Sequence, residues 1–345
     1  MTCAGEAQSA PRCPSAVAET VATGEQRAML LTDDGVSIEA RYQPSPGPGT
    51  EPSGQLALVV GHGFSGALER PALRRVASAF QQRTAVITFS FRGHGRSGGR
   101  STVGDREVLD LAAAVRWARR LGHRRVATVG FSMGGSVVIR QAALYGKTDE
   151  IQPLQDVHQG ERTGRSPGRT DGVLGSPGEV TGSPGEVTDA PAGPADGAAS
   201  AGSADSAAPA GPTDGAAPDA VVAVSSPARW YYRGTAPMRR LHWAITRPTG
   251  RLVSRYGLRT RIDPGGWAID PLSPVAAAPL IAPTPLLIVH GDRDPYFPLD
   301  HPRMLASAAD PSTSELWIEP GYGHAETAAS PELLARIADW AAAHA

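Results

Sequence analysis

The sequence predicts one large α/β domain: a doubly wound, mostly parallel sheet of eight strands, with a small helical lid and a disordered insert. Two observations indicate this class. Segments with strand patterns alternate with segments of helical periodicity along the chain. Most of the strand-like segments are continuous apolar runs, which is typical of parallel strands covered by helices on both faces. The chain has 345 residues, enough for one such domain after tail and insert are removed.

The expected strands run from a hairpin near the start of the domain to its C-terminal part. "AMLLT" (28–32) and "VSIEARY" (36–42) form the hairpin across residues 33–35. Six further strands are expected at "QLALVVGHGF" (55–64), "TAVITFSF" (84–91), "RVATVG" (125–130), "AVVAVSSP" (220–227), "PLLIVHGDRD" (285–294) and "SELWIEP" (314–320). Helices are expected over 67–82 and 103–121, directly after Ser132, and over 331–343, where Ser330 precedes Pro331 as an N-cap.

A change in composition separates residues 148–219 from the rest. This stretch is rich in Gly, Pro, Ala, Ser and Asp, has no aromatic residue and contains "GSPGEVT" twice in tandem at 175–188. We expect it and residues 1–26 to be disordered, because neither buries enough apolar surface to offset its ordering entropy. The packed domain expected from the sequence is then 27–147 plus 220–345. Deletion of residues 150–217 is expected to leave fold and activity intact, since loop-closure entropy grows slowly with length.

Composition also bears on the classes of function. A net charge of −1 gives no indication of nucleic-acid binding. The two cysteines, Cys3 and Cys13, cannot make a disulfide framework or a four-ligand zinc site, and no H-E-x-x-H spacing occurs. We therefore expect no metal and no cofactor. The first 26 residues lack the features of a signal peptide, and no apolar run is long enough to cross a membrane. A cytoplasmic location is expected, although the scarcity of cysteines leaves a secreted one open.

The pattern G-x-S-x-G occurs three times, at Ser97, Ser132 and Ser166. Ser166 lies within the insert. Ser97 leads into loop-like sequence, whereas Ser132 stands where a strand passes into a helix. Such a turn exposes the serine hydroxyl at the carboxyl edge of the sheet and directs the backbone N–H of Met133 at whatever the hydroxyl attacks. Ser132 is the predicted nucleophile.

A serine nucleophile needs a base and an acid that orients the base. Asp292 and Asp294 follow the strand "PLLIVHG", and His324 follows the strand "SELWIEP". Both loops stand at carboxyl ends of strands, so we expect their side chains to converge on Ser132. The spacing alone leaves both aspartates open as the acid.

With these motifs the sequence resembles the α/β-hydrolase superfamily, over residues 28–147 and 220–345. The matching segments, in the expected order, are "VVGHGF" (59–64), "FRGHGRS" (91–97), "GFSMGG" (130–135), "HGDRDPYFP" (290–298) and "GYGHAE" (321–326). The resemblance implies an α/β-hydrolase fold with Ser132 as nucleophile and His324 as general base and then acid. It favours Asp294 over Asp292 as the orienting acid, and it implies an oxyanion hole from the N–H groups of Phe64 and Met133. His62, His94 and His290 are expected to shape loops.

The resemblance also implies a lid over the site, which we expect within residues 228–280. Its most distinctive part, the arginine-rich segment (229–261), has nine arginines and no acidic residue, with Trp and Tyr residues interleaved. Three interpretations stay open. The segment forms amphipathic lid helices whose arginine stems cover apolar surface, selects an anionic substrate, or makes peripheral contact with an anionic membrane.

The predicted function is a serine hydrolase that cleaves a small-molecule carboxylic ester through an acyl-serine intermediate. Alternatives with the same three residues are a thioesterase, an acyltransferase, a perhydrolase or a C–C bond hydrolase. A remote alternative is a non-catalytic binding protein on the same fold. The substrate, including whether it is anionic or lipid-like, and the oligomeric state stay open, since fold class alone does not determine them.

Overall fold

The computed structural model describes residues 24–46, 56–146 and 215–345. Most of the predicted tail (1–26) and insert (148–219) therefore lies outside the described residues. Residues 215–219 are described, however, and Ala216 among them is fully buried. Its carbonyl oxygen accepts a hydrogen bond of 2.7 Å from the Gln141 side chain. The packed domain thus begins before residue 220, and a deletion meant to spare it should end at 214 rather than 217.

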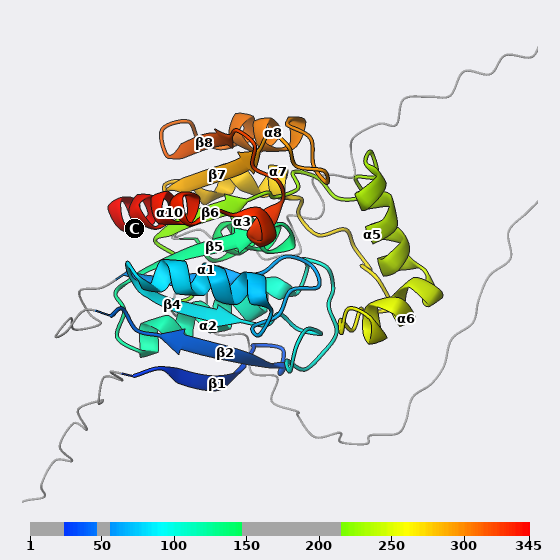
Figure 1. Cartoon of the computed structure of the whole chain (residues 1–345), viewed down its shortest axis with the longest axis horizontal. Helices are drawn as coiled ribbons and strands as arrows, with labels where there is room; N and C mark the ends of the chain where they lie inside the picture. The colour runs from blue at the N-terminus through cyan, green and yellow to red at the C-terminus, as the bar shows by residue number, and fades with distance from the viewer. Residues whose placement is uncertain (1–23, 47–55, 147–214) are drawn as a thin grey trace, which may run out of the picture.

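Eight strands form one sheet in the order β1-β2-β4-β3-β5-β6-β7-β8 (Figure 1). Every pair from β4 to β8 is parallel, while β2 pairs antiparallel with both β1 and β4. The predicted mostly parallel eight-stranded sheet is therefore confirmed. The strands are β1 (Gln26–Leu31), β2 (Ser37–Gln43), β3 (Leu56–Gly61), β4 (Ala85–Phe89), β5 (Arg125–Phe131), β6 (Ala220–Val224), β7 (Leu286–Gly291) and β8 (Ser314–Glu319).

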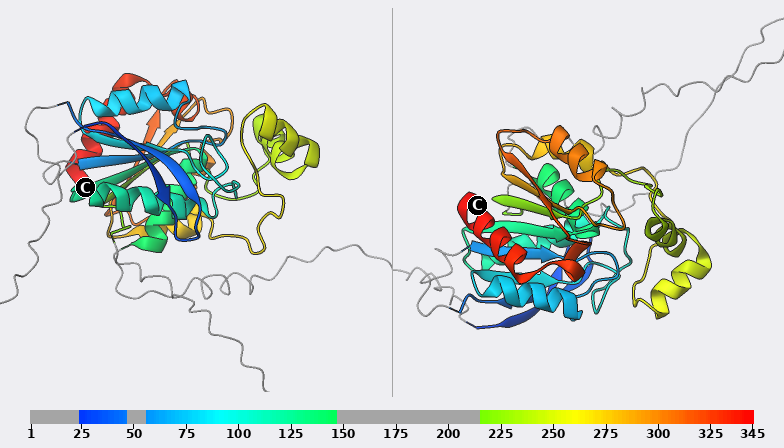
Figure 2. Two further views of the ribbon diagram at one scale, coloured as in Figure 1. Left: turned by 90° about the horizontal axis from the view of Figure 1, so that it is seen from below. Right: turned by 45° about the horizontal axis from the view of Figure 1, so that its top comes forward.

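Helices cover both faces of the sheet, which explains the continuous apolar runs. All residues of β3, β4, β6 and β7 are buried, and two apolar clusters lie on the two sides of the sheet. One face carries α1 (Pro71–Gln81), α9 (Ala325–Ala328) and α10 (Pro331–His344). The other carries α2 (Glu107–Arg120), α3 (Met133–Tyr145), α7 (Pro274–Ala277), the 3₁₀ helix η3 (Ala278–Ile281) and α8 (Asp300–Ala308) (Figures 1 and 2).

Helix α2 begins at Glu107, four residues later than the pattern predicts. The Glu107 side chain explains the difference, because it is fully buried and its two carboxylate oxygens accept hydrogen bonds from Ser101, Thr102 and Gly104. These bonds hold residues 101–104 as a loop that would otherwise continue the helical pattern. The loop contributes to the wall of the pocket described below.

The segment after β6 leaves the body of the molecule before the chain returns to β7. It holds α5 (Ala236–Thr246) and α6 (Pro248–Tyr256), which project beyond the carboxyl edge of the sheet in all three views (Figures 1 and 2). Both helices fall inside the range predicted as a lid. Thr235 caps α5, since its hydroxyl accepts a hydrogen bond from the Met238 N–H. Within the described ranges no helix is long and apolar enough to cross a membrane.

Candidate active site

Ser132 stands alone between the end of β5 and the start of α3. Its backbone is in an unusual conformation, with φ 52° and ψ −111°, a region that a residue with a side chain enters only at a cost in free energy. Two hydrogen bonds hold it there: the Ser132 N–H donates to the Val224 carbonyl at 2.8 Å, and its own carbonyl accepts from Ser136 at 3.2 Å. The strained turn lifts the hydroxyl above the sheet edge.

The two glycines of the motif are required by close approach of the backbone. A Cβ at Gly130 would lie 2.0 Å from the carbonyl oxygen of Gly134, and a Cβ at Gly134 would lie 2.5 Å from the carbonyl oxygen of Gly61. Neither contact can be relieved by rotating a side chain, because in each case the added Cβ would meet a backbone carbonyl oxygen. The motif at Ser132 therefore describes a turn in which β3, β5 and α3 meet.

The structure brings Ser132, His324 and Asp294 together, although they come from three separate loops. The Ser132 Oγ lies 3.0 Å from His324 Nε2, and His324 Nδ1 lies 2.7 Å from Asp294 Oδ2. Both distances are within hydrogen-bonding range. Because the carboxylate accepts the Nδ1 proton, Nε2 is left as the acceptor that faces the hydroxyl.

The surroundings of Asp294 distinguish it from Asp292. The Asp294 side chain is 0% exposed, and its second oxygen accepts hydrogen bonds from the N–H groups of Tyr296 (2.8 Å) and Phe297 (3.1 Å). Asp292 instead accepts a hydrogen bond from the Gly321 N–H on an exposed turn. Of the two aspartates that the spacing left open, Asp294 is the one in contact with His324.

The His324 ring is held on a second side by an aromatic ring. The Tyr296 ring stacks on it with centroids 4.2 Å apart and planes inclined by 28°. The chain after His324 is anchored as well, since the Ala325 N–H donates to Ser225 Oγ at 3.1 Å and the Ala325 carbonyl accepts from the Tyr322 hydroxyl at 2.8 Å. The imidazole is therefore fixed by packing and by neighbouring backbone contacts.

The other two serines of the pattern are placed differently. Ser97 is fully buried, donates to the Ser90 carbonyl at 2.6 Å and accepts from the Glu39 N–H at 3.0 Å. Its hydroxyl therefore links a loop to β2 and faces no histidine. Ser166 lies outside the described residues.

The remaining histidines named above make backbone contacts; His62 and His94 lie in loops, whereas His290 belongs to β7. The fully buried His62 accepts from the Phe91 N–H at 3.1 Å and donates to the Gly63 carbonyl at 2.7 Å, and burial lowers its pKa to about 3. His94 contacts the Arg92 carbonyl, and His290 contacts the Phe297 carbonyl. Burial lowers the pKa of both. Within the described part of the chain, no group of three His, Cys, Asp or Glu residues is arranged to hold a metal ion.

The backbone amides of Phe64 and Met133 flank the turn. Met133 is the first residue of α3, so its N–H is one of the donors that a helix leaves unsatisfied at its N-terminus. Phe64 follows the carboxyl end of β3 by three residues. Neither amide donates a hydrogen bond to another described residue. Both N–H groups are therefore available to a ligand.

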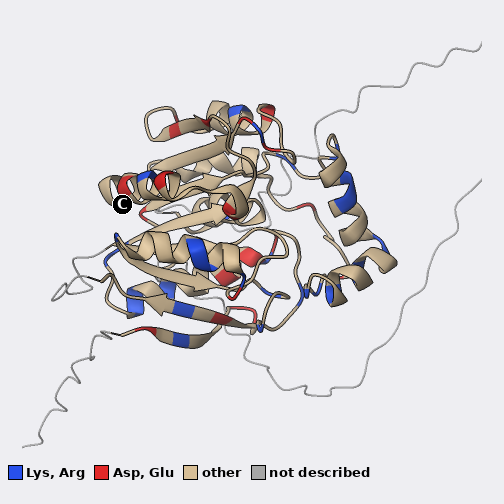
Figure 3. Cartoon of the chain, in the orientation of Figure 1, with Lys and Arg blue, Asp and Glu red and all other residues tan. Residues whose placement is uncertain are grey.

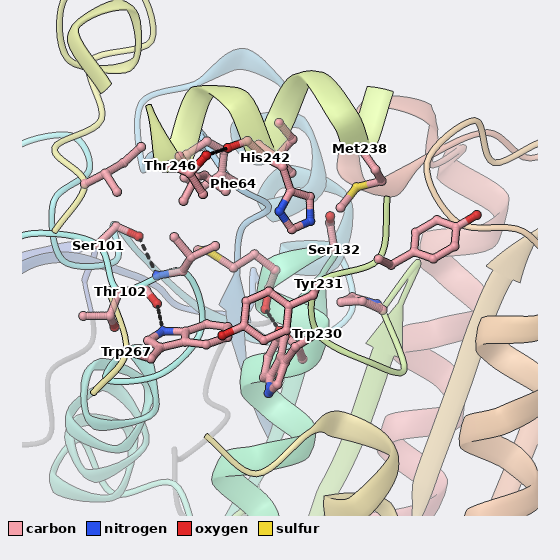
Figure 4. A pocket seen from close by; sticks show the side chains of 18 of the residues that line it. Phe64, Ser101, Thr102, Ser132, Trp230, Tyr231, Met238, His242, Thr246 and Trp267 are labelled. Carbon is pink, nitrogen blue, oxygen red and sulfur yellow. Dashed lines mark hydrogen bonds between the residues drawn. The ribbon is translucent and has the colours of Figure 1, made fainter. Parts of the chain in front are cut away.

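A pocket of about 220 Å³ opens beside Ser132, with α5 as one wall. Figure 4 shows Met238 and His242 of α5 on one side of the pocket and Trp230, Tyr231 and Trp267 on another. Further apolar lining comes from Phe64, Val103, Met133, Leu241, Ile245, Ile262 and Phe297, and polar lining from Ser101, Thr102, Ser136, Thr246 and Asp263. Of the nine arginines of the arginine-rich segment, only Arg229 lines the pocket, and its guanidinium is paired with Asp300 at 3.0 Å.

Glu326 is a residue at the site that the sequence reasoning missed. It lies two residues after His324, is 7% exposed, and accepts a hydrogen bond from the Gly63 N–H at 3.2 Å. Its second carboxylate oxygen is buried with no hydrogen-bond partner among the described residues. Burial raises the pKa of this carboxyl. The one sequence signal for Glu326 was its place in the "GYGHAE" segment. That signal was weak, since a lone glutamate in a helix-like stretch is typical of a surface residue.

The raised pKa of Glu326 predicts a pH-dependent contribution to stability. Folding favours the protonated form, so the stabilisation is complete below the pKa of the unfolded chain and is lost as the pH rises through the folded-state pKa. Glu326→Gln keeps an acceptor for Gly63 and cannot ionise. The free energy of unfolding of the wild type is expected to fall relative to this variant over the pH range above the ordinary glutamate pKa of about 4.3. Urea denaturation of both proteins across that range measures the difference, and parallel curves would contradict the prediction.

The fold and the site together define a class: a doubly wound sheet with a strained serine turn after a central strand, and with His and Asp loops after later strands. Comparison with known families agrees. The model of the Alpha/beta hydrolase family matches residues 57–337. The chain therefore belongs to the alpha/beta hydrolase family. No curated protein gives a significant sequence match.

Solved structures share the fold at low sequence identity. An esterase from Pyrococcus furiosus, Pf2001, is 18% identical with a TM-score of 0.54, over 92% of this chain and 91% of that one. The alpha/beta hydrolase GrgF from Penicillium sp. sh18 is 16% identical with a TM-score of 0.55, over 93% of this chain and 98% of that one. DcsB, solved in complex with its substrate analogue, is 16% identical with a TM-score of 0.56, over 93% and 100%. At these identities the likeness concerns the fold.

Proposed function

We propose that this protein is a serine hydrolase that cleaves uncharged carboxylic esters through an acyl-serine intermediate. The observation that carries the proposal is the chain of contacts from Ser132 through His324 to the buried Asp294, at 3.0 and 2.7 Å. A serine hydroxyl is a weak nucleophile until a base takes its proton, and this arrangement supplies the base in the required tautomer.

The proposed reaction has two halves. In the first, Ser132 Oγ attacks the ester carbonyl carbon while His324 Nε2 takes the hydroxyl proton, and Asp294 stabilises the imidazolium. The tetrahedral intermediate collapses as His324 gives the proton to the leaving alcohol, which leaves an acyl-serine. In the second, His324 Nε2 takes a proton from water as the water oxygen attacks the acyl carbon. The second tetrahedral intermediate then collapses: the bond from the acyl carbon to Ser132 Oγ breaks, the carboxylic acid leaves, and His324 returns the proton to Oγ.

The free amides of Phe64 and Met133 are proposed to bind the negative oxygen of each tetrahedral intermediate. Preorganised donors of this kind stabilise developing charge without reorganising during the reaction, and loss of one typically costs about 3 kcal/mol of barrier. The Gly63–Glu326 hydrogen bond supports this role, because it holds the residue that precedes Phe64.

The lining of the pocket supports an apolar acyl or alkoxy group rather than an anionic one. Aromatic and aliphatic side chains form most of the wall, and the one arginine in it is already paired with Asp300. A charged substrate would lose its hydration there without a free cation to replace it. Of the alternatives left open by the sequence, selection of an anionic substrate is thus disfavoured.

Truncation of a pocket residue tests the substrate class. Ile245→Ala removes apolar surface from the α5 wall, so KM for a medium-chain ester is expected to rise about tenfold while kcat changes little. Leu280→Ala is the matched control: it also truncates an aliphatic side chain, but one that is 47% exposed and away from the pocket. KM and kcat of both variants are measured on acetate and hexanoate esters. Equal changes of KM in the two variants would contradict the assignment of the pocket to the apolar part of the substrate.

Labelling with a fluorophosphonate probe tests the function itself, since the probe reacts with activated serines and requires no known substrate. The wild type is expected to be labelled, and Ser132→Ala and His324→Ala are expected not to be. Folded wild-type protein that resists labelling would favour a non-catalytic binding protein. Product analysis with competing alcohols, thiols and peroxide then distinguishes hydrolysis from acyl transfer and perhydrolysis.

A further inference from the structure

Exposed hydrophobic side chains gather on the arginine-rich segment (229–261). Ten large hydrophobic side chains of the described residues are exposed, and six belong to this segment: Tyr231, Trp243, Leu252, Val253, Tyr256 and Leu258. Single exposed apolar residues are common on protein surfaces, but such a concentration marks a surface that another body covers. The helices that carry it project beyond the sheet edge (Figures 1 and 2).

The same segment carries positive charge without compensation. It contains nine arginines and no acidic residue, and Figure 3 shows blue bands and no red on α5 and α6. The arginines of these two helices are Arg239, Arg240, Arg251 and Arg255, with Arg247 between them; none forms an ion pair with a described residue. Arg239 and Arg251 donate hydrogen bonds to backbone carbonyls of the segment, but no acidic side chain of the described residues neutralises these five charges.

Helix α5 presents two faces of different character. Met238, Leu241 and Ile245 line the pocket beside Ser132, whereas Arg239, Arg240 and Trp243 are exposed and absent from its lining. The enzyme site therefore accounts for one face only. It does not involve the exposed Trp243 ring or the charges of Arg239 and Arg240 on the other face, where Arg239 donates hydrogen bonds to the Arg233 and Gly234 carbonyls.

Helix α6 packs against α5 through its small residues. A Cβ at Gly250 would lie 2.2 Å from the Trp243 carbonyl oxygen, and the buried Ser254 donates a hydrogen bond to the Ala244 carbonyl at 3.4 Å. This packing turns Leu252, Val253 and Tyr256 outward, with exposed fractions of 58%, 52% and 72%. We call the exposed arginine, aromatic and aliphatic residues of the two helices and of the junction between them (239, 240, 243, 247, 252, 253, 255 and 256) the outer face.

We propose that the outer face docks on an anionic lipid membrane. Arginines near such a surface gain energy from its negative potential, and their stems and the aromatic rings suit the boundary between headgroups and acyl chains. Leu252 and Val253 add the apolar contact that anchors an interfacial helix. Docking does not depend on the proposed ester hydrolysis, but it would bring the pocket wall formed by α5 next to the lipid surface.

Two other occupants fit the outer face less well. A single-stranded nucleic acid would pair with the arginines and stack on the aromatic rings, but it offers nothing to the exposed aliphatic side chains Leu252, Val253 and Leu258. A second copy of the chain would bring an equally positive face against this one, because a two-fold interface places identical patches together. Repulsion among the unpaired arginines opposes that pairing.

Vesicle binding tests the proposal directly. The full chain with Ser132→Ala, which prevents ester hydrolysis during the assay, is mixed with phosphatidylcholine vesicles that contain either no phosphatidylserine or about one-third of it. Co-sedimentation is expected to show at least about tenfold tighter binding to the anionic vesicles. Binding should fall in about 0.5 M NaCl, where the Debye length is only about 4 Å.

Variants assign the binding to the outer face. Arg239→Gln with Arg240→Gln is expected to weaken binding to anionic vesicles about thirtyfold, and Leu252→Ser with Tyr256→Ser about tenfold or more. Arg120→Gln with Arg124→Gln is the matched control, because it removes the same charge from two exposed arginines that precede β5, at the opposite edge of the sheet. The control should bind as the parent does.

Several outcomes would overturn the proposal. These are equal binding to neutral and anionic vesicles, no binding to either, or outer-face variants that bind as tightly as the control. Binding of an oligothymidine instead of vesicles would assign the face to nucleic acid, and a concentration-dependent dimer lost in the same variants would assign it to a second copy. The outer-face variants are also made with Ser132 intact and treated with the fluorophosphonate probe. Labelling tests the proposed function and vesicle binding tests docking, so either proposal can fail without the other.

Discussion

Replacing Ser132 by alanine is expected to lower kcat for ester hydrolysis by about 10⁵- to 10⁶-fold. Without the hydroxyl no acyl-serine forms, because His324 Nε2 then faces no nucleophile from which it can take a proton. The backbone amides of Phe64 and Met133 remain, so some acceleration over water should survive. Turnover of a nitrophenyl ester by purified protein, with trace contamination assessed by active-site titration, measures the loss.

Ser97→Ala is the control that decides between the two described G-x-S-x-G serines. Its kcat is expected to stay close to that of the wild type, because the Ser97 hydroxyl bonds to the backbone of Ser90 and Glu39 rather than to a histidine ring. Its stability should fall by about 1–3 kcal/mol, since the variant leaves the Glu39 N–H and the Ser90 carbonyl without their buried partner. A Ser132→Ala protein with full activity, or a Ser97→Ala protein with none, would show that the wrong serine was chosen.

Replacing Asp294 by asparagine is expected to lower kcat by about 10⁴-fold with little change in the fold. An amide NH₂ facing His324 Nδ1 favours the tautomer with its proton on Nε2, where the proton blocks transfer from Ser132. It also removes the charge that stabilises the imidazolium. The remaining amide oxygen can still accept the N–H groups of Tyr296 and Phe297, so the loop should hold its shape.

Asp292→Asn is the matched control, since it makes the same substitution two residues away. The Asp292 carboxylate contacts the Gly321 N–H and not His324, so kcat should change by less than about threefold. Circular dichroism and thermal denaturation of both variants would exclude unfolding as the cause of any loss. Equal losses in the two variants, or a loss only in Asp292→Asn, would transfer the orienting role to Asp292.

Local sequence patterns were sufficient for most of the fold. Each central strand is a continuous apolar run, and each run is followed by a glycine-containing loop or a helical period, so the elements and their mostly parallel arrangement follow from burial on both faces. The exceptions lie where a long-range contact overrides the pattern. Glu107 shortens the predicted helix by holding residues 101–104, and the buried Ala216 extends the packed domain before 220.

Most residues of the candidate site could also be predicted from the sequence. Ser132, His324 and the pair of aspartates follow strand ends, and parallel strands bring their carboxyl ends to one edge. Strand-end position alone left Asp292 and Asp294 open and the family resemblance favoured Asp294, which is the one that contacts His324 in the structure. Glu326 escaped notice for a related reason: its partner, the Gly63 N–H, is 263 residues away in the chain.

The sequence by itself determined the eight strands, the helices α1, α2, α3 and α10, and the residue types at the carboxyl edge of the sheet, since these depend on apolar periodicity and on glycines at tight turns; it did not mark α8 or α9. It also showed that residues 229–261 combine arginine with aromatic residues. Only the tertiary structure decided which side of each helix meets the pocket and which meets solvent. That division depends on how α5 and α6 pack on each other and on the body, and it separates an apolar pocket from a positively charged outer face.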